Sequence, residues 1–202
     1  MALTRRQLIG TTAGLGLTMG LGMTPASAKD MPAVPTDFDA KQCFDALMKA
    51  FEEKKTGIRT APEIPGAPTA VMLFDTQCQW CIWQEAQLEP FAKKVNFIWF
   101  PVAVLNHWSE PQGAAILESK TPLETWKQHR DNFRSADFKG LDVRKMEISM
   151  QARDAVWTNS KIYRRAGGRE VPFGVLHSTD GRLIVLPQLK SEEFEKLTGI
   201  HA

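Results

Sequence analysis

A Cys-x-x-Cys motif, Cys78 to Cys81, stands between an apolar run and a helical pattern. The run at 70–74 is short and apolar, which predicts a buried strand, and residues 82–88 predict a helix. A helix N-terminus carries partial positive charge and unpaired N–H groups, which stabilise a thiolate on the first cysteine. The second cysteine lies close enough to resolve a mixed disulfide. The motif therefore predicts a thiol pair for disulfide exchange at the junction of a strand and a helix.

Other uses of paired cysteines need partners that this sequence largely lacks. A zinc site takes about four ligands, but the only further cysteine is Cys43, and the histidines are scattered at 107, 129, 177 and 201. A c-type haem needs histidine directly after the second cysteine, where Ile82 stands. We therefore expect no metal and no organic cofactor. A structural disulfide and a copper carrier remain open, because soft thiolates bind Cu(I), although no methionine or histidine stands beside the pair.

The first 28 residues have the pattern of an export signal. Arg5-Arg6 is followed by a Gly-, Thr- and Ala-rich apolar run to Met23, and the segment 25–28 ends in the small residues of a cleavage site. The arginine pair predicts a twin-arginine signal, with an ordinary Sec signal as the alternative. We expect cleavage near Ala28 and a periplasmic location.

Composition excludes several classes of partner. The formal net charge of +2 equals the two charges of Arg5 and Arg6, so the chain without its signal is balanced. A balanced chain offers no electrostatic case for binding nucleic acid. Three cysteines are too few for a disulfide scaffold. The odd one, Cys43, fits either a buried core thiol or an intermolecular disulfide.

Hydrophobic periodicity predicts an α/β domain over 69–202, preceded by an N-terminal helix and a Pro-rich linker over 29–68. Asp180-Gly181 predicts the turn of a β-hairpin. The expected elements are a helix at 37–55, strands at 69–75 and 95–104, an active-site helix at 79–94 kinked by Pro90, a helical insert at about 107–168, hairpin strands at 172–177 and 182–186, and a closing helix at 191–199. Two strands joined through a helix, followed by a hairpin, give a mixed sheet with a helical insert between its halves.

The thiol pair after Phe74-Asp75, the proline at 172 and the helical insert between them coincide in one pattern. This pattern resembles the thioredoxin superfamily and, within it, the periplasmic disulfide isomerases of the DsbC and DsbG type. The stretch 111–120 followed by Thr125-Trp126 looks especially like DsbG. The resemblance covers residues 69–200, which is essentially the whole predicted catalytic domain.

The resemblance implies a role for each residue of the pattern. Cys78 is implied to be the nucleophile, Cys81 the resolving thiol, and Pro172 a cis-proline that faces them. Because proline lacks an N–H, the backbone of Val171 can offer its groups to an extended substrate chain. The implied partners are client proteins with disulfides or oxidised thiols, and a thiol-redox partner at the inner membrane.

The sequence departs from these isomerases in three ways. Gln79-Trp80 separates the cysteines where Pro-Tyr or Gly-Tyr is usual, and Val171 stands where threonine is usual. Residues 29–68 are too few for an N-terminal dimerisation domain, so we expect a monomer and favour reduction over isomerisation.

Trp80 is expected to present an aromatic surface to clients, or else to pack on the fold. Neither histidine nor a charge lies between the cysteines, so the pKa of Cys78 should fall only moderately below the free value of about 8.5.

Overall fold

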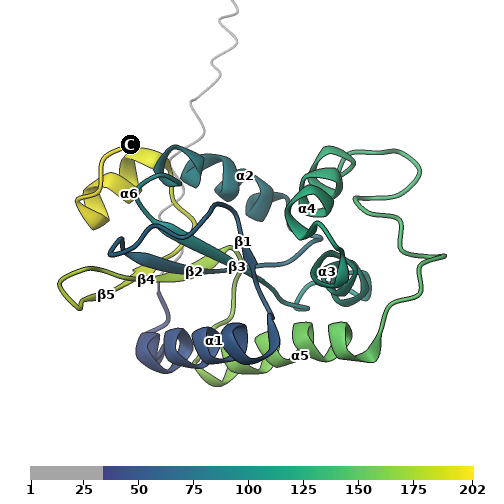
Figure 1. Cartoon of the computed structure of the whole chain (residues 1–202), viewed down its shortest axis with the longest axis horizontal. Coiled ribbons are helices and arrows are strands. Elements are labelled where there is room, and N and C mark those ends of the chain that lie inside the picture. The colour runs from purple at the N-terminus through teal and green to yellow at the C-terminus, as the bar shows by residue number, and fades with distance from the viewer. Residues whose placement is uncertain (1–33) are drawn as a thin grey trace, which may run out of the picture.

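Five strands form one mixed sheet in the computed structural model, which describes residues 34–202 (Figure 1). Their order across the sheet is β1-β3-β2-β4-β5. The strands are β1 Ile58–Arg59, β2 Thr69–Phe74, β3 Asn96–Pro101, β4 Phe173–His177 and β5 Leu183–Leu186. The predicted signal peptide over residues 1–28 lies outside the described residues.

The central strand β2 has a parallel neighbour on one side and an antiparallel neighbour on the other. Its pairing with β3 is parallel and begins with Thr69 opposite Asn96. Its pairing with β4 is antiparallel, with Val71 opposite Val175. β4 and β5 then form the predicted antiparallel hairpin. These pairings confirm the mixed sheet expected from the sequence.

Helices cover both faces of this sheet. In Figure 1, α1 and α5 lie on one face, α2 and α6 lie on the other, and α3 and α4 lie together at one end of the sheet. The helices are α1 Ala40–Lys54, α2 Gln79–Leu88, α3 Ser109–Glu118, α4 Pro122–Asp131, α5 Met150–Arg165 and α6 Ser191–Thr198. Helices α3 to α5 and their connections form the insert between β3 and β4.

Side chains of β2 alternate between two cores, because successive residues of a strand point to opposite faces. Met72 and Phe74 belong to the core that also contains Cys78 and Cys81. Leu73 belongs to the core on the opposite face, with residues of α1 and α5. All three β2 side chains are fully buried. Apolar burial on both faces stabilises β2 and so fixes the start of the loop that follows its carboxyl end.

Two elements differ from the sequence prediction. The active-site helix ends at Leu88 rather than at 94, and a 3-10 turn covers Glu89–Phe91. Pro90 explains this end, because proline cannot donate the backbone hydrogen bond that a continuing helix requires. The short strand β1 lies at the start of the segment expected to be a linker, where Ile58 pairs with Trp99 of β3.

Within residues 34–202, no helix has both the length and the apolar character needed to span a membrane.

Candidate active site

Cys78 occupies the N-cap position of α2, immediately after the loop that leaves β2. Its backbone is extended, and its carbonyl accepts a hydrogen bond from the Cys81 N–H at 3.1 Å. Cys81 lies one turn into the helix and is fully buried, whereas Cys78 is 7% exposed. Both side chains are free thiols. The strand–loop–helix junction therefore places one thiol near the surface and the other beneath it.

The surroundings of Cys78 favour its thiolate. A hydrogen bond from the Cys81 thiol makes the largest contribution, and the backbone N–H groups of Trp80 and Cys81 add to it. Burial and the negative charge of Asp75 act in the opposite direction. Together these interactions lower the pKa of Cys78 to about 7. A thiol with this pKa is substantially ionised at neutral pH, which is the form that attacks disulfides.

Cys81 is held in the opposite state. Burial raises its pKa well above the ordinary value, and the hydrogen bond that it donates to Cys78 raises the pKa further. The two thiols thus differ in both exposure and acidity. Of the two thiols, Cys78 is therefore the more readily ionised and the less deeply buried.

The loop before β4 completes the surroundings of the Cys78 thiol. Cys78 Sγ lies 3.5 Å from the carbonyl oxygen of Val171. The peptide bond between Val171 and Pro172 is cis. Segments 93 residues apart in the sequence therefore meet at the Cys78 thiol.

Asp75, three residues before Cys78, fixes the loop that carries it. The side chain is fully buried, and its carboxylate accepts hydrogen bonds from three backbone N–H groups. The donors are Gln77 at 2.8 Å, Val104 at 2.9 Å and Leu105 at 3.0 Å. A carboxylate that accepts several N–H groups joins the loop after β2 to the loop after β3.

Gln77 connects the same loop to the insert. Its side-chain amide donates to Gln112 Oε1 at 2.6 Å and accepts from the Asn106 side chain at 3.3 Å. Gln112 in turn donates to the backbone carbonyls of Lys139 and Leu141 at 2.8 and 2.9 Å. Lys139 Nζ donates to the Gln77 carbonyl at 2.9 Å, directly before Cys78 in the chain.

His129 of α4 is the second link between the insert and this loop. Its Nδ1 accepts from the Leu141 N–H at 3.1 Å, so its Nε2 carries the proton and donates to the Thr76 carbonyl at 2.8 Å. Burial lowers the pKa of His129 to about 4, which keeps the ring neutral. Gly140 has a positive φ of 82° beside this ring, and a Cβ there would lie 2.2 Å from it.

Trp80 lies next to the thiol pair and is 45% exposed. Its ring packs edge-on against Trp83, with 6.2 Å between ring centroids. Part of the indole is therefore used in packing within α2, and the remainder is exposed.

Cys43 lies away from this site, within α1. The side chain is fully buried, and burial raises its pKa to about 12. An unreactive buried thiol packs like a small apolar side chain. An intermolecular disulfide at Cys43 would require α1 to leave the core, so the structure favours the core-thiol interpretation.

Metal binding would depend on the two thiols of the motif. Within residues 34–202, no group of three or more His, Cys, Asp or Glu side chains is placed to hold a metal ion. A copper carrier would therefore have to bind Cu(I) through Cys78 and Cys81 without a third ligand of these types.

Comparison with solved structures identifies the fold. The chain is similar to a periplasmic thioredoxin-like protein from Salmonella enterica serovar Typhimurium, with 15% identity, a TM-score of 0.59 and coverage of 76% of this chain and 94% of that one. It is also similar to the catalytic domain of Proteus mirabilis ScsC, with 14% identity, a TM-score of 0.60 and coverage of 78% and 96%. Helicobacter pylori DsbG shares 18% identity and a TM-score of 0.50, over 67% of this chain and 62% of that one.

Sequence comparisons add no family. No protein-family model matches this chain, and no curated protein matches it. The structural similarities confirm the predicted thioredoxin-like α/β fold, with the helical insert between the two halves of the sheet.

Proposed function

We propose that this chain is an exported thiol:disulfide oxidoreductase that acts on other proteins. The observation that carries the proposal is the unequal state of the two thiols at the start of α2. Cys78 is acidic and near the surface, whereas Cys81 is buried with a raised pKa. The thioredoxin-like fold supports the same function, and the periplasmic thioredoxin-like protein that shares this fold supports the location.

The proposed reaction follows from this arrangement. The Cys78 thiolate attacks one sulfur of a client disulfide, forms a mixed disulfide and releases the first client thiolate. Cys81 then attacks Cys78 Sγ and leaves a Cys78–Cys81 disulfide, and the second client sulfur departs with the proton that Cys81 gives up. The client disulfide gains two electrons and the pair loses two. A thiol-redox partner at the membrane would return the pair to its reduced form.

Reduction is the proposed net direction, with the chain acting as a monomer. The same first step on a client sulfenic acid forms the mixed disulfide and releases hydroxide, so oxidised single cysteines are proposed clients as well. Val171 and Pro172 are proposed to contact the client chain, because the loop they form touches Cys78. Trp80 is proposed to contribute its exposed aromatic surface to the same contact.

Two experiments test the proposal: trapping of mixed disulfides with clients, and measurement of the redox potential of the Cys78–Cys81 pair. Cys81→Ser protein should accumulate mixed disulfides with periplasmic clients, and Cys78→Ser protein should form none. Equilibration with glutathione should give a potential toward about −270 mV for a reductase, whereas a value toward about −120 mV would reverse the proposed direction. Stoichiometric Cu(I) binding without any disulfide exchange would replace the proposal with the copper-carrier function.

A further inference from the structure

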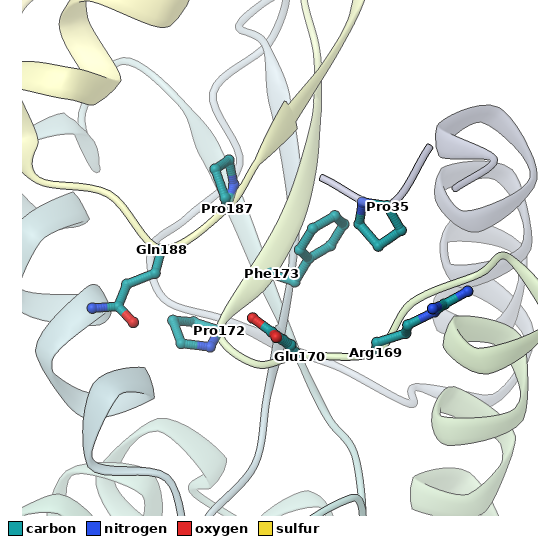
Figure 2. A pocket seen from close by; sticks show the side chains of 7 residues that line it. All are labelled: Pro35, Arg169, Glu170, Pro172, Phe173, Pro187 and Gln188. Carbon is teal, nitrogen blue, oxygen red and sulfur yellow. The ribbon is translucent and has the colours of Figure 1, made fainter. Parts of the chain in front are cut away.

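A cavity of about 240 Å³ lies beside Pro172, and nothing in the reaction above uses it (Figure 2). Three separate segments line it: the chain before α1, the loop before β4 together with the first residue of that strand, and the loop after β5. Its lining residues are Pro35, Arg169, Glu170, Pro172, Phe173, Pro187 and Gln188. The loop before β4 also carries Val171, whose carbonyl contacts Cys78 Sγ at 3.5 Å. The residues on either side of Val171, Glu170 and Pro172, therefore line the cavity, while Val171 itself contacts the Cys78 thiol.

Part of the cavity wall is apolar and conformationally restricted, formed by the prolines and Phe173. Three of the seven lining residues are prolines, whose rings fix the backbone φ angle. Phe173 is buried and packs edge-on against Phe38, with 4.7 Å between ring centroids. Such a wall can cover the methylene groups of a long side chain without losing much conformational freedom of its own.

The two charged residues of the lining are in different states. Arg169 forms an ion pair with Asp37 at 2.9 Å, so its charge is already compensated. Among the described residues, the Glu170 carboxylate has no ion-pair partner. In Figure 2 this carboxylate is directed toward Pro172 and Phe173, and the Arg169 guanidinium points away from it. The cavity thus offers one uncompensated negative charge.

The backbone of Glu170 is also anchored. The buried Tyr163 hydroxyl accepts a hydrogen bond from the Glu170 N–H at 3.1 Å and donates one to the Glu170 carbonyl. Both backbone groups of Glu170 are therefore fixed by a single core side chain. A carboxylate on a fixed backbone beside an apolar wall is suited to a ligand that is both long-chained and cationic.

We propose that this cavity is a client subsite for a lysine or arginine side chain near the cysteine that bonds to Cys78. The methylene stem would pack on Pro172 and Pro187, and the cationic group would pair with Glu170. An extended client chain places alternate side chains on the same face, which allows one residue to reach the cavity while another bonds to the thiol. The inference rests on the proposed function and adds a preference among clients.

Peptides of equal length test the preference directly. Each carries one cysteine activated as a mixed disulfide with thionitrobenzoate, whose release reports attack by the reduced protein. Lysine, norleucine or glutamate is placed in turn at each of the positions on either side of the cysteine. At low salt, lysine should raise the second-order rate about two- to fivefold over norleucine at one or more positions, and glutamate should lower it.

Variants of Glu170 show whether the lysine preference depends on the charge of this side chain or on the shape of the cavity. Glu170→Gln should bring the lysine-to-norleucine rate ratio close to one, and Glu170→Lys should shift the preference to glutamate peptides. The readout is a ratio within each variant, so a change in overall reactivity cancels. Glu52→Gln, on the exposed surface of α1, changes the charge equally and should keep the wild-type ratio.

Three outcomes would overturn the inference, and they distinguish the loss of the subsite from the loss of the proposed function. Equal rates for all peptides, or a lysine preference that survives Glu170→Gln, would remove the subsite while disulfide exchange stands. Neutral dithiodipyridine tests the proposed function separately from the subsite, because its reaction needs only a reactive thiol. A wild-type protein that fails to react with it would overturn the proposed function and the subsite together.

Discussion

The sheet and the insert hold the same active-site loop, residues 75–78, by different kinds of interaction. On the sheet side, the loop continues from β2, whose last residues through Phe74 are fully buried and apolar. On the insert side, the loop is held by hydrogen bonds from His129 and Lys139 and by the amide pair of Gln77 and Gln112.

This difference predicts that the stability of the fold and the position of Cys78 depend on different parts of the molecule. Apolar burial is strong but non-directional, so the sheet should supply most of the free energy of folding. Hydrogen bonds are weaker in net terms but directional, so the insert should determine where the loop places Cys78. Changes in the sheet should therefore lower stability without altering the thiol, and changes at the insert contact should alter both.

The largest effect on stability is expected from Phe100→Ala in β3. Phe100 is fully buried and packs edge-on against Phe51 of α1, in the core on the face away from the thiol pair. Removing the ring should lower the free energy of unfolding by about 3–5 kcal/mol, measured by urea denaturation. The pKa of Cys78, measured from the pH dependence of its alkylation rate, should stay near 7.

Phe100→Leu is the matched variant, because it keeps an apolar side chain and should lose less stability than Phe100→Ala. A clear shift in the Cys78 pKa in either variant would show that the sheet also controls the thiol. The separation between stability and position would then be wrong.

The second effect is expected from His129→Leu in α4. The substitution leaves the Thr76 carbonyl and the Leu141 N–H without their partner in a buried site. Two such groups should together cost about 2–4 kcal/mol of stability. Because Thr76 lies two residues before Cys78, the loop should loosen and the pKa of Cys78 should rise from about 7 toward its free value.

His129→Gln distinguishes hydrogen bonding from packing. Glutamine has one amide donor and one carbonyl acceptor, so it should recover part of the stability and part of the low Cys78 pKa. If glutamine restores neither while leucine is tolerated, the histidine acts by shape alone.

The same contrast explains what the sequence could and could not predict. Apolar periodicity located β2, β3 and the hairpin, because burial leaves a local pattern that repeats along the chain. The contact between His129 and Thr76 joins residues 53 apart, and that between Gln77 and Gln112 joins residues 35 apart. No local pattern encodes such pairs.

One sequence signal for His129 does exist. It stands three residues after Trp126 and four before Phe133, which places all three side chains on one face of the helical segment. A histidine on an apolar face predicts burial with both ring nitrogens satisfied, as the structure shows. The strand β1 had no comparable signal, since two residues cannot show a period and only their pairing with Trp99 and Ile98 of β3 defines it.

The third effect is expected from Asp75→Asn, which should lower both the free energy of unfolding and the pKa of Cys78. The carboxylate accepts from three N–H groups, and an asparagine side chain has only one acceptor oxygen. Asp75→Asn should therefore lower the free energy of unfolding by about 1–3 kcal/mol. The negative charge of Asp75 raises the pKa of Cys78, so its removal should lower that pKa.

Urea denaturation and alkylation against pH measure the two results on the same preparation. Asp154→Asn, on the exposed side of α5, is the matched control and should change neither quantity appreciably. A Cys78 pKa that rises in the Asp75 variant would mean that the hydrogen bonds of Asp75 matter more to the thiol than its charge does.

The smallest effect is a pH dependence that belongs to the thiol pair itself. Cys78 has a pKa of about 7 in the folded chain, against about 8.5 when unfolded. Between these values the unfolded chain binds more protons than the folded chain, so stability rises with pH. The reduced protein should gain about 1 kcal/mol from about pH 7 to about pH 8, and this contribution should disappear as the pH falls through about 7.

The Cys78→Ser variant isolates this contribution, because its stability curve lacks the Cys78 thiol. Burial raises the pKa of Cys81 and Cys43, so these thiols act with the opposite sign. They lower stability only above about pH 8.5, where the unfolded thiols ionise. Urea unfolding with reductant present should thus give a wild-type-minus-variant difference that climbs between pH 7 and pH 8. A flat difference would show that the start of α2 does not stabilise the thiolate, and the insert contact would then position a thiol of ordinary acidity.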